Sequence, residues 1–259
     1  MGFIQANLFS QIMRQHTNLT IAMPEIQLTE ERKYPILYLL HGGTEDSTIW
    51  FREANIERLA LEYNLFIVSI DAMSSSYADM RHGLPYFTFL TEELPALVKR
   101  RLPISTSPDD SFIAGLSMGG QGALKAALRK PELYAACISI SGARDMVPLY
   151  KQWQQLENGP NLSGVEDAVG PIDQIYGSEN DLLYLAKRSA EKRVKMPELY
   201  IACGDQDYAR TLTDDYHMYL QNLGIQHDYY VGPGIHDYAF GEQALEHALQ
   251  LICKGGKLL

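Results

Sequence analysis

A serine between glycines is the first candidate for chemistry in this chain. Residues 110–124 read DSFIAGLSMGGQGAL, and the run GLSMG at 115–119 matches the pattern G-x-S-x-G. An apolar run precedes this pattern and helical spacing follows it, which predicts a sharp strand–turn–helix around Ser117. Glycines at positions 115 and 119 remove the Cβ atoms that would clash in such a turn. A serine held in this way can act as a nucleophile, although the bare pattern also occurs in ordinary turns.

A base and an acid follow the serine, each after a predicted strand. His236 lies in VGPGIHD at 231–237, and Asp207 lies in GDQDY at 204–208, with Asp205 as the alternative acid. A carboxylate would hold the imidazole in one tautomer and stabilise its charge when it takes the serine proton. The competing interpretations are a solvated loop histidine and a helix cap or metal loop. Asp237 is better interpreted as the N-cap of the next helix.

Backbone N–H groups are the third requirement, because the oxyanion of an acyl-transfer reaction needs donors. His41-Gly42-Gly43 follows an early predicted strand, and we expect the N–H groups of Gly43 and Met118 to form this oxyanion hole. His41 is expected to be structural, with its ring bonded to the neighbouring backbone.

Substrate contacts are expected from residues near these loops. The candidates are Gly42, Trp50, Tyr77, Tyr176 and Tyr238, and the aromatic rings of Tyr208 and Phe240 lie close in sequence to the same loops. Packing of the insertion onto the sheet is the alternative for each ring.

Alternating strands and helices must position these residues. The alternation of apolar and polar residues around Leu19, Ile21 and Met23, then Ile26 and Leu28, predicts antiparallel strands at a sheet edge. Apolar runs of strand length, typical of strands covered on both faces, occur at 34–40, 65–70, 112–114, 134–140, 199–203 and 226–231. Helical spacing occurs at about 56–63, 86–102 (with a kink or a new first turn at Pro95), 122–128, 181–193, 214–223 and 238–252.

This order predicts an α/β fold with a mostly parallel central sheet and helices on both faces. In such sheets functional residues gather at the carboxyl ends of the strands. The stretch 143–176 interrupts the pattern with Gly159-Pro160, Gly164 and Gly170-Pro171. We interpret it as a cap-like insertion over the strand ends within a single domain that spans residues 1–259.

Composition narrows the class of protein. The chain has 259 residues, 46% of them hydrophobic and 21% charged, which is enough to bury a sizeable core. A formal net charge of −10 disfavours nucleic-acid and anionic-membrane partners, which need clustered Lys and Arg. The three cysteines suggest neither a disulfide framework nor a metal site, and no run resembles a signal peptide or a membrane span. We expect a cytoplasmic protein that needs no metal or cofactor; a homo-oligomer is compatible with these observations.

Motifs along nearly the whole chain occur in the order found in one family. They are FIQANLFS at 3–10, LLHGG at 39–43, Trp50, FLTEELP at 89–95, GLSMGG at 115–120, CGDQD at 203–207 and GIHDY at 234–238. In these motifs the chain resembles α/β-hydrolases of the esterase D and tributyrin esterase (EstA-like) family, which is similar to S-formylglutathione hydrolases and feruloyl esterases. The resemblance implies the α/β-hydrolase fold, a triad of Ser117, Asp207 and His236, and short-chain acyl esters as substrates.

The expected activity is that of a serine carboxylesterase working through an acyl-enzyme. One alternative is an S-formylglutathione hydrolase, although those enzymes carry a cysteine in the oxyanion loop where this chain has TED at 44–46. A carbohydrate or feruloyl ester esterase, an acyltransferase and a non-catalytic hydrolase-fold binding protein are the others. The 143–176 insertion is expected to decide which ester is bound.

Overall fold

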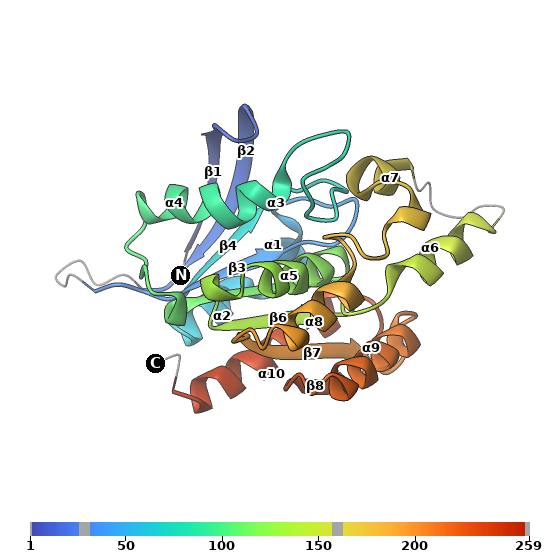
Figure 1. Cartoon of the computed structure of the whole chain (residues 1–259). Helices are drawn as coiled ribbons and strands as arrows, with labels where there is room; N and C mark the ends of the chain where they lie inside the picture. Colours follow the sequence, from blue (N-terminus) through green and yellow to red (C-terminus); the bar gives the residue numbers. More distant parts are fainter. Residues whose placement is uncertain (1, 26–31, 157–162, 257–259) are drawn as a thin grey trace.

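An eight-stranded sheet forms the centre of the computed structural model, which describes residues 2–25, 32–156 and 163–256 (Figure 1). Its strand order is β1-β2-β4-β3-β5-β6-β7-β8. The strands are Gly2–Ser10 (β1), Gln15–Met23 (β2), Ile36–Leu40 (β3), Phe66–Ile70 (β4), Ser111–Leu116 (β5), Ala136–Ile140 (β6), Glu198–Gly204 (β7) and Asp228–Gly232 (β8). The predicted strand positions Ile26 and Leu28, and Gly159-Pro160 of the insertion, lie outside the described residues.

Strand direction is reversed at β2. β1 pairs antiparallel with β2, and β2 pairs antiparallel with β4. From β4 through β3, β5, β6 and β7 to β8 the pairs are parallel. The predictions of an antiparallel edge and of a mostly parallel sheet are therefore confirmed. Parallel pairing also brings the carboxyl ends of β3, β5, β6, β7 and β8 to one edge.

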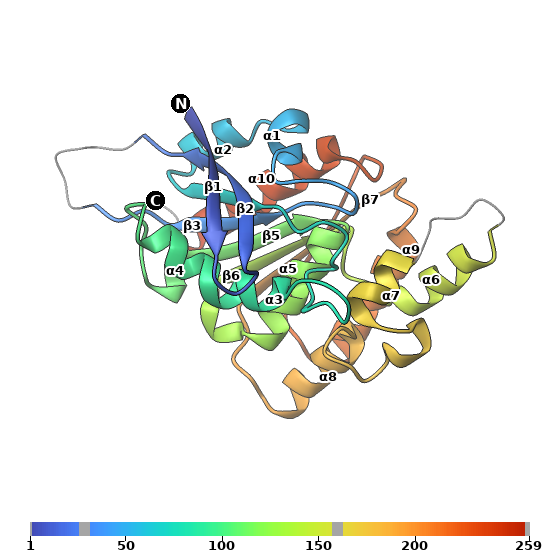
Figure 2. The same ribbon diagram turned by 90° about the horizontal axis from the view of Figure 1, so that it is seen from above.

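Both faces of the sheet are covered by helices, because the parallel strands are apolar on both faces. In β3, Ile36, Tyr38 and Leu40 belong to one core, whereas Leu37 and Leu39 belong to the other. Figure 2 shows α1, α2 and α10 on one side of the sheet and α4, α5 and α8 on the other. These helices, with α9 beside α8, are Ile49–Glu53 (α1), Ile56–Glu62 (α2), Leu94–Lys99 (α4), Met118–Arg129 (α5), Leu182–Glu191 (α8), Arg210–Asn222 (α9) and Tyr238–Lys254 (α10).

Pro95 divides the predicted helix at 86–102. A short helix, α3 (Tyr86–Thr88), runs into a π-helical turn at Phe89–Glu93, and α4 begins at the residue before Pro95. Proline has no N–H to donate inside a helix, so it is tolerated in the first turn of α4. The expected interruption at Pro95 is confirmed.

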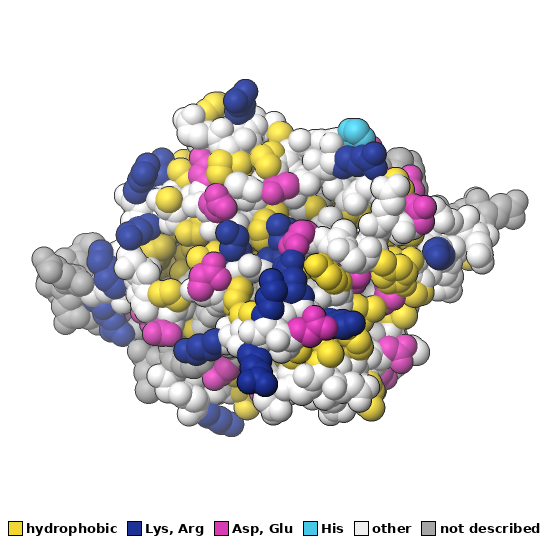
Figure 3. All heavy atoms as spheres, viewed as in Figure 1, with side chains coloured by type: hydrophobic (Ala, Val, Ile, Leu, Met, Phe, Trp, Pro, Cys, Tyr) yellow, Lys and Arg dark blue, Asp and Glu magenta, His cyan; other side chains and the backbone are white. Residues whose placement is uncertain are grey.

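The surface over α5 and α8 carries both signs of charge. Figure 3 shows basic and acidic side chains lying among one another on this face. Some of these charges are paired, since the Glu179 carboxylate contacts Arg129 at 3.0 Å and also pairs with Arg188. Within the described residues, no helix is both long enough and apolar enough to cross a membrane.

The insertion contains two helices that the sequence analysis did not identify, α6 (Met146–Gln154) and α7 (Ser163–Val169). Asp145 caps α6 by accepting a hydrogen bond of 3.0 Å from the Val147 N–H, and Pro148 lies in the first turn, where proline is tolerated. The two helices pack around a small separate core made of Met146, Val147, Leu149, Tyr150, Ile172 and Ile175, with Trp153, Val165, Val169 and Leu212 against it.

The turn between β5 and α5 holds Ser117 in a strained conformation. The serine has φ 57° and ψ −116°, and its N–H donates to the Ile140 carbonyl at 2.8 Å. A Cβ atom on Gly119 would lie 2.2 Å from the Leu40 carbonyl oxygen, and one on Gly115 would lie 2.3 Å from the Gly119 carbonyl carbon. The turn can therefore form only because positions 115 and 119 carry no Cβ atom, which lets backbone lie directly against backbone.

Replacing Gly119 by alanine should destabilise the fold by about 3 kcal/mol or more, because the backbone carbonyls of β3 cannot move aside. The matched control is Gly164→Ala in α7, where a Cβ atom would meet nothing within 4 Å. That variant should stay within about 1 kcal/mol of the parent. Urea unfolding midpoints of the three proteins measure the difference, and equal midpoints for both variants would contradict the steric argument.

Candidate active site

A pocket of about 620 Å³ lies at the edge where the parallel strands end. Its volume is in the range of small-molecule sites. The residues that matter below are Gly43, Ser117, Met118, Arg144, Tyr208 and His236, and all of them line it. The structure thus brings the predicted nucleophile, base and oxyanion donors into one cavity.

His236 and Asp207 are directly paired. The imidazole Nδ1 lies 2.8 Å from one carboxylate oxygen of Asp207 and 3.0 Å from the other. The Asp207 side chain has no exposed surface, whereas 18% of the His236 side chain is exposed. A buried carboxylate that accepts from Nδ1–H fixes the tautomer in which Nε2 can accept a proton.

Asp207 is held by two further donors besides the imidazole. The Ser141 hydroxyl donates to it at 2.6 Å and the Ala209 N–H at 2.7 Å. Burial raises the pKa of the carboxyl, but the hydrogen bonds from His236 and Ser141 outweigh it and hold the pKa of Asp207 below its ordinary value. The carboxylate therefore stays ionised although it is buried.

The two neighbouring aspartates, Asp205 and Asp237, accept hydrogen bonds from backbone N–H groups. Asp205 is exposed, and its carboxylate accepts from the Gly234 N–H at 3.0 Å, which shapes the loop before His236. Asp237 accepts from the Phe240 N–H at 2.9 Å as the N-cap of α10, so the cap prediction is confirmed. Neither aspartate is recorded in contact with the imidazole, within the part of the chain that the structure describes.

The Tyr208 hydroxyl is hydrogen-bonded to the second ring nitrogen of His236. Because Nδ1 donates to Asp207, Nε2 of the neutral ring is an acceptor, and the Tyr208 hydroxyl donates to it at 3.2 Å. The two rings also lie with their centroids 4.4 Å apart. Among the described residues Ser117 and His236 share no hydrogen bond, so Tyr208 takes the position on Nε2 that a serine hydroxyl would need.

The loop after β3 offers a backbone donor at Gly43. The Gly42 N–H donates to Glu45 at 2.9 Å and to the Tyr238 hydroxyl at 3.1 Å. Gly43 lines the pocket, and its N–H has no hydrogen-bond partner within the described residues. The Met118 N–H begins α5, where no intrahelical carbonyl accepts it. These two N–H groups can therefore receive an oxyanion.

His41 shapes this loop as a structural histidine, as expected. Its Nε2 accepts from the Ala72 N–H at 3.0 Å, so Nδ1 carries the proton and donates to the Gly42 carbonyl at 2.7 Å. Burial lowers the pKa of His41, which keeps the ring neutral and both bonds intact.

Two of the aromatic residues expected in the substrate pocket lie beneath it. Trp50 is fully buried, and its Nε1–H donates to the Leu40 carbonyl at 3.0 Å. Tyr77 is fully buried as well, and its hydroxyl donates to the His41 carbonyl at 3.2 Å. This corrects the expectation for both residues: they support the backbone of the oxyanion loop and do not line the pocket.

Tyr176 and Tyr238 have different positions. Tyr176 lies outside the pocket lining, half exposed, with its hydroxyl bonded to Asp145 at 2.8 Å, which corrects the expected substrate contact. Tyr238 lines the pocket, and its hydroxyl donates to the Glu45 carboxylate. Gly42 also lines the pocket.

Several pocket residues were not identified from the sequence. Met146, Tyr150 and Trp153 of α6 form an apolar wall, and Arg144 lies just before this helix. The signal was present, since positions 146, 149, 150 and 153 follow the i, i+3, i+4, i+7 spacing of an amphipathic helix.

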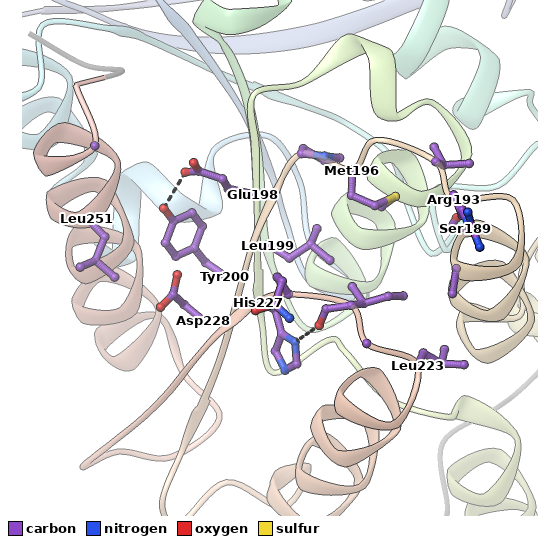
Figure 4. A pocket seen from close by; sticks show the side chains of 17 residues that line it. Ser189, Arg193, Met196, Glu198, Leu199, Tyr200, Leu223, His227, Asp228 and Leu251 are labelled. Carbon is purple, nitrogen blue, oxygen red and sulfur yellow. Dashed lines mark hydrogen bonds between the residues drawn. The ribbon is translucent and has the colours of Figure 1, made fainter.

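A larger cavity, of about 810 Å³, lies at the opposite ends of β7 and β8 (Figure 4). Its polar side chains are bonded locally: Tyr200 donates to Glu198 at 3.0 Å, and His227 Nδ1 contacts the Ile225 carbonyl at 2.8 Å. It contains neither the strained serine nor the paired base. Size alone therefore does not mark the reactive cavity.

Comparisons with known proteins agree with this geometry. The model of the Esterase family matches residues 10–250. An acetyl esterase from Caldicellulosiruptor saccharolyticus is 25% identical over 265 residues, which cover 98% of this chain and 99% of that protein.

Solved structures give the same family. The fluorophosphonate-binding serine hydrolase FphF of Staphylococcus aureus has a TM-score of 0.89 at 32% identity, over 97% of this chain and 98% of that one. The S-formylglutathione hydrolase FrmB of the same organism has a TM-score of 0.85 at 32% identity and the same coverage. A ferulic acid esterase at 22% identity, with a TM-score of 0.80, shares the fold. The chain therefore belongs to the Esterase family and is a serine ester hydrolase of the α/β-hydrolase fold.

Proposed function

We propose that this protein hydrolyses short-chain acyl esters through a triad of Ser117, His236 and Asp207. The observation that carries the proposal is the pairing of His236 with a buried, ionised Asp207 in the same pocket as a strained serine. The kinship to an acetyl esterase and to a fluorophosphonate-binding serine hydrolase supports the same chemistry.

In the acylation half of the reaction, Nε2 of His236 accepts the proton of the Ser117 hydroxyl while Oγ forms a bond to the ester carbonyl carbon. The carbonyl oxygen becomes an oxyanion and accepts hydrogen bonds from the Gly43 and Met118 N–H groups. Asp207 stabilises the imidazolium. The imidazolium then gives its proton to the departing alcohol as the C–O bond breaks, which leaves the acyl group on Ser117.

Deacylation repeats these steps with water. His236 takes a proton from a water molecule, whose oxygen attacks the acyl carbon, and the same two N–H groups hold the second oxyanion. The proton then returns to Ser117 Oγ as the acid leaves. Each half of the reaction uses Nε2 of the base, so the Tyr208 hydroxyl must release this nitrogen before Ser117 can transfer its proton.

Short acyl chains fit the shape and lining of the pocket. Its apolar wall comes from Met146, Tyr150 and Trp153 of α6, and Val165 of α7 adds to it. The cavity of about 620 Å³ must hold both the acyl and the alcohol part of the ester. We therefore propose that a few methylene groups, and not a long fatty chain, contact α6.

Thioester hydrolysis is the second candidate, favoured by the 32% identity to an S-formylglutathione hydrolase. In this chain the oxyanion loop has Thr44-Glu45-Asp46, and the Glu45 carboxylate is bonded to Gly42 and Tyr238. Turnover of S-formylglutathione relative to a butyrate ester separates the two candidates, and a higher kcat/KM for the thioester would reverse our preference.

Ser117→Ala should lower kcat for a short 4-nitrophenyl ester by at least about a thousandfold, since the nucleophile is lost and only binding and the oxyanion hole remain. The variant should also resist covalent labelling by a fluorophosphonate, which intact mass measures. The control is Ser141→Ala, which should still be labelled. Ser141 donates to Asp207 and is not the proposed nucleophile. Labelling of the Ser117→Ala protein would assign the nucleophile elsewhere.

Asp207→Asn should lower kcat about a thousandfold or more, because an amide can no longer select the tautomer that leaves Nε2 free. Asp205→Asn is its matched control, two residues away, with a carboxylate that accepts from the Gly234 N–H. It should cost less than about tenfold, the effect of losing one hydrogen bond. Equal losses in steady-state kinetics, or a larger loss at Asp205, would overturn the choice of acid.

Tyr208→Phe should raise kcat/KM by up to about fivefold, because the hydrogen bond that competes for Nε2 contributes about 1 kcal/mol. Tyr184→Phe, at a tyrosine on α8 outside the pocket lining, should leave kcat/KM unchanged. A decrease beyond about tenfold in the Tyr208 variant would show instead that its hydroxyl takes part in turnover.

A further inference from the structure

Arg144 is a buried cation in the wall of the proposed ester pocket. It follows β6 by four residues, its exposed fraction is 3%, and it lines the same cavity as Ser117 and His236. Its guanidinium carbon lies 5.9 Å from the centre of the Tyr208 ring, which in turn contacts the base. The proposed mechanism uses Arg144 in no step.

Its partners in the protein are neutral. Nε donates to the Met146 sulfur at 3.1 Å, and one Nη donates to the Ser141 carbonyl. Within the described part of the chain no carboxylate forms an ion pair with Arg144. The adjacent Asp145 carboxylate is already engaged by the Val147 N–H and the Tyr176 hydroxyl.

A guanidinium in this position has donors to spare. Arginine presents five N–H donors, and a thioether is a weak acceptor. A buried cation without an anion is unfavourable unless a partner is supplied, and the forked face of arginine matches a carboxylate in a bidentate arrangement. Nε and one Nη of Arg144 have partners, and the other Nη is not among the fully enclosed atoms that lack one. Since Arg144 lines the cavity, its unused donors open onto it.

We propose that Arg144 binds a carboxylate on the substrate, so that the preferred esters carry an anionic group. This inference rests on the proposed esterase function. It requires that the anion reach the β6 side of the pocket, where the neighbouring walls are the apolar side chains of Met146 and Tyr150.

The charged side chains that line the pocket are distributed in a way that fits an anionic group at Arg144. Three acidic residues line the pocket. Glu45 and Glu53 lie on the β3 side, in the loop after β3 and at the end of α1. Asp237 follows β8, and its carboxylate is engaged by the Phe240 N–H as the cap of α10. In the sheet, β5 lies between β3 and β6, so Ser117 separates Glu45 and Glu53 from Arg144. An anion would be repelled at one end of the cavity and attracted at the other, which orients the ester across the nucleophile.

The carboxylate could be carried by either half of the ester, and two matched pairs of substrates distinguish them. Monoethyl glutarate and its neutral terminal amide place the group on the acyl chain. The compounds 4-carboxyphenyl butanoate and its neutral carboxamide place it on the alcohol. Hydrolysis of all four is followed by pH-stat for the parent enzyme, Arg144→Lys and Arg144→Met. Arg193→Met, on the exposed rim of the opposite cavity, makes the same change in net charge and is the control.

In one of the two pairs, Arg144→Met should lower the anionic-to-neutral ratio of kcat/KM by about tenfold or more, mainly through KM. Arg144→Lys should restore part of the ratio, and Arg193→Met should not change it. A role confined to holding Ser141 would slow both members of each pair equally. Unchanged ratios in both pairs, within about twofold, would therefore overturn the proposal.

Failure of the esterase function is recognised separately. If the folded parent enzyme hydrolyses none of the four esters, that function fails, and the anion site is then tested by calorimetric titration with glutarate and with benzoate. Tighter binding to the parent than to Arg144→Met, at equal melting temperatures, would sustain the site. Equal binding, or none to either protein, would refute it.

Discussion

Close contact of backbone with backbone is the constraint on which the site depends. The start of α5 lies against the ends of β3 and β6, so that a Cβ atom on Gly119 or Gly120 would collide with the carbonyls of Leu40 or Ile140. From the other side, a Cβ atom on Gly142 would lie 2.3 Å from the Gln121 nitrogen. Because these glycines let three strand ends and one helix converge, the strained Ser117 and the loop that carries Gly43 come to the same pocket.

Burial favours the neutral form of both His41 and Asp207, and hydrogen-bond donors decide which of them stays charged. His41 receives one backbone donor and gives one, so burial keeps it neutral. Asp207 is equally enclosed, yet donors from an imidazole, a hydroxyl and an N–H hold its charge. Arg144 is the third buried group, and its protein partners do not include an anion within the described residues. Within the described residues, the charge of Asp207 is thus fully hydrogen-bonded by protein groups, whereas the charge of Arg144 has no anionic partner.

The sequence predicts those parts of the molecule that depend on local pattern. The strands buried on both faces, the glycine turn and the cap at Asp237 follow from neighbours in the chain, and the contact of His236 with Asp207 follows from parallel strand ends meeting at one edge. The directions of Trp50 and Tyr77 could not be predicted, because a ring near a loop can pack beneath the backbone as well as above it. Helix α6 was not predicted because Gly159-Pro160, Gly164 and Gly170-Pro171 mark the stretch as an irregular insertion and mask its short apolar spacing.

The insertion has a thermodynamic property of its own. Its small core of Met146, Leu149, Tyr150 and Ile172 is separate from the two cores that flank the sheet. Substitutions in well-separated cores have nearly additive effects on stability. Changes in α6 or α7 can therefore remodel one wall of the pocket without loosening the turn that holds the serine. In evolutionary terms, mutations in this module and mutations in the turn at Ser117 would be selected for stability almost independently of one another.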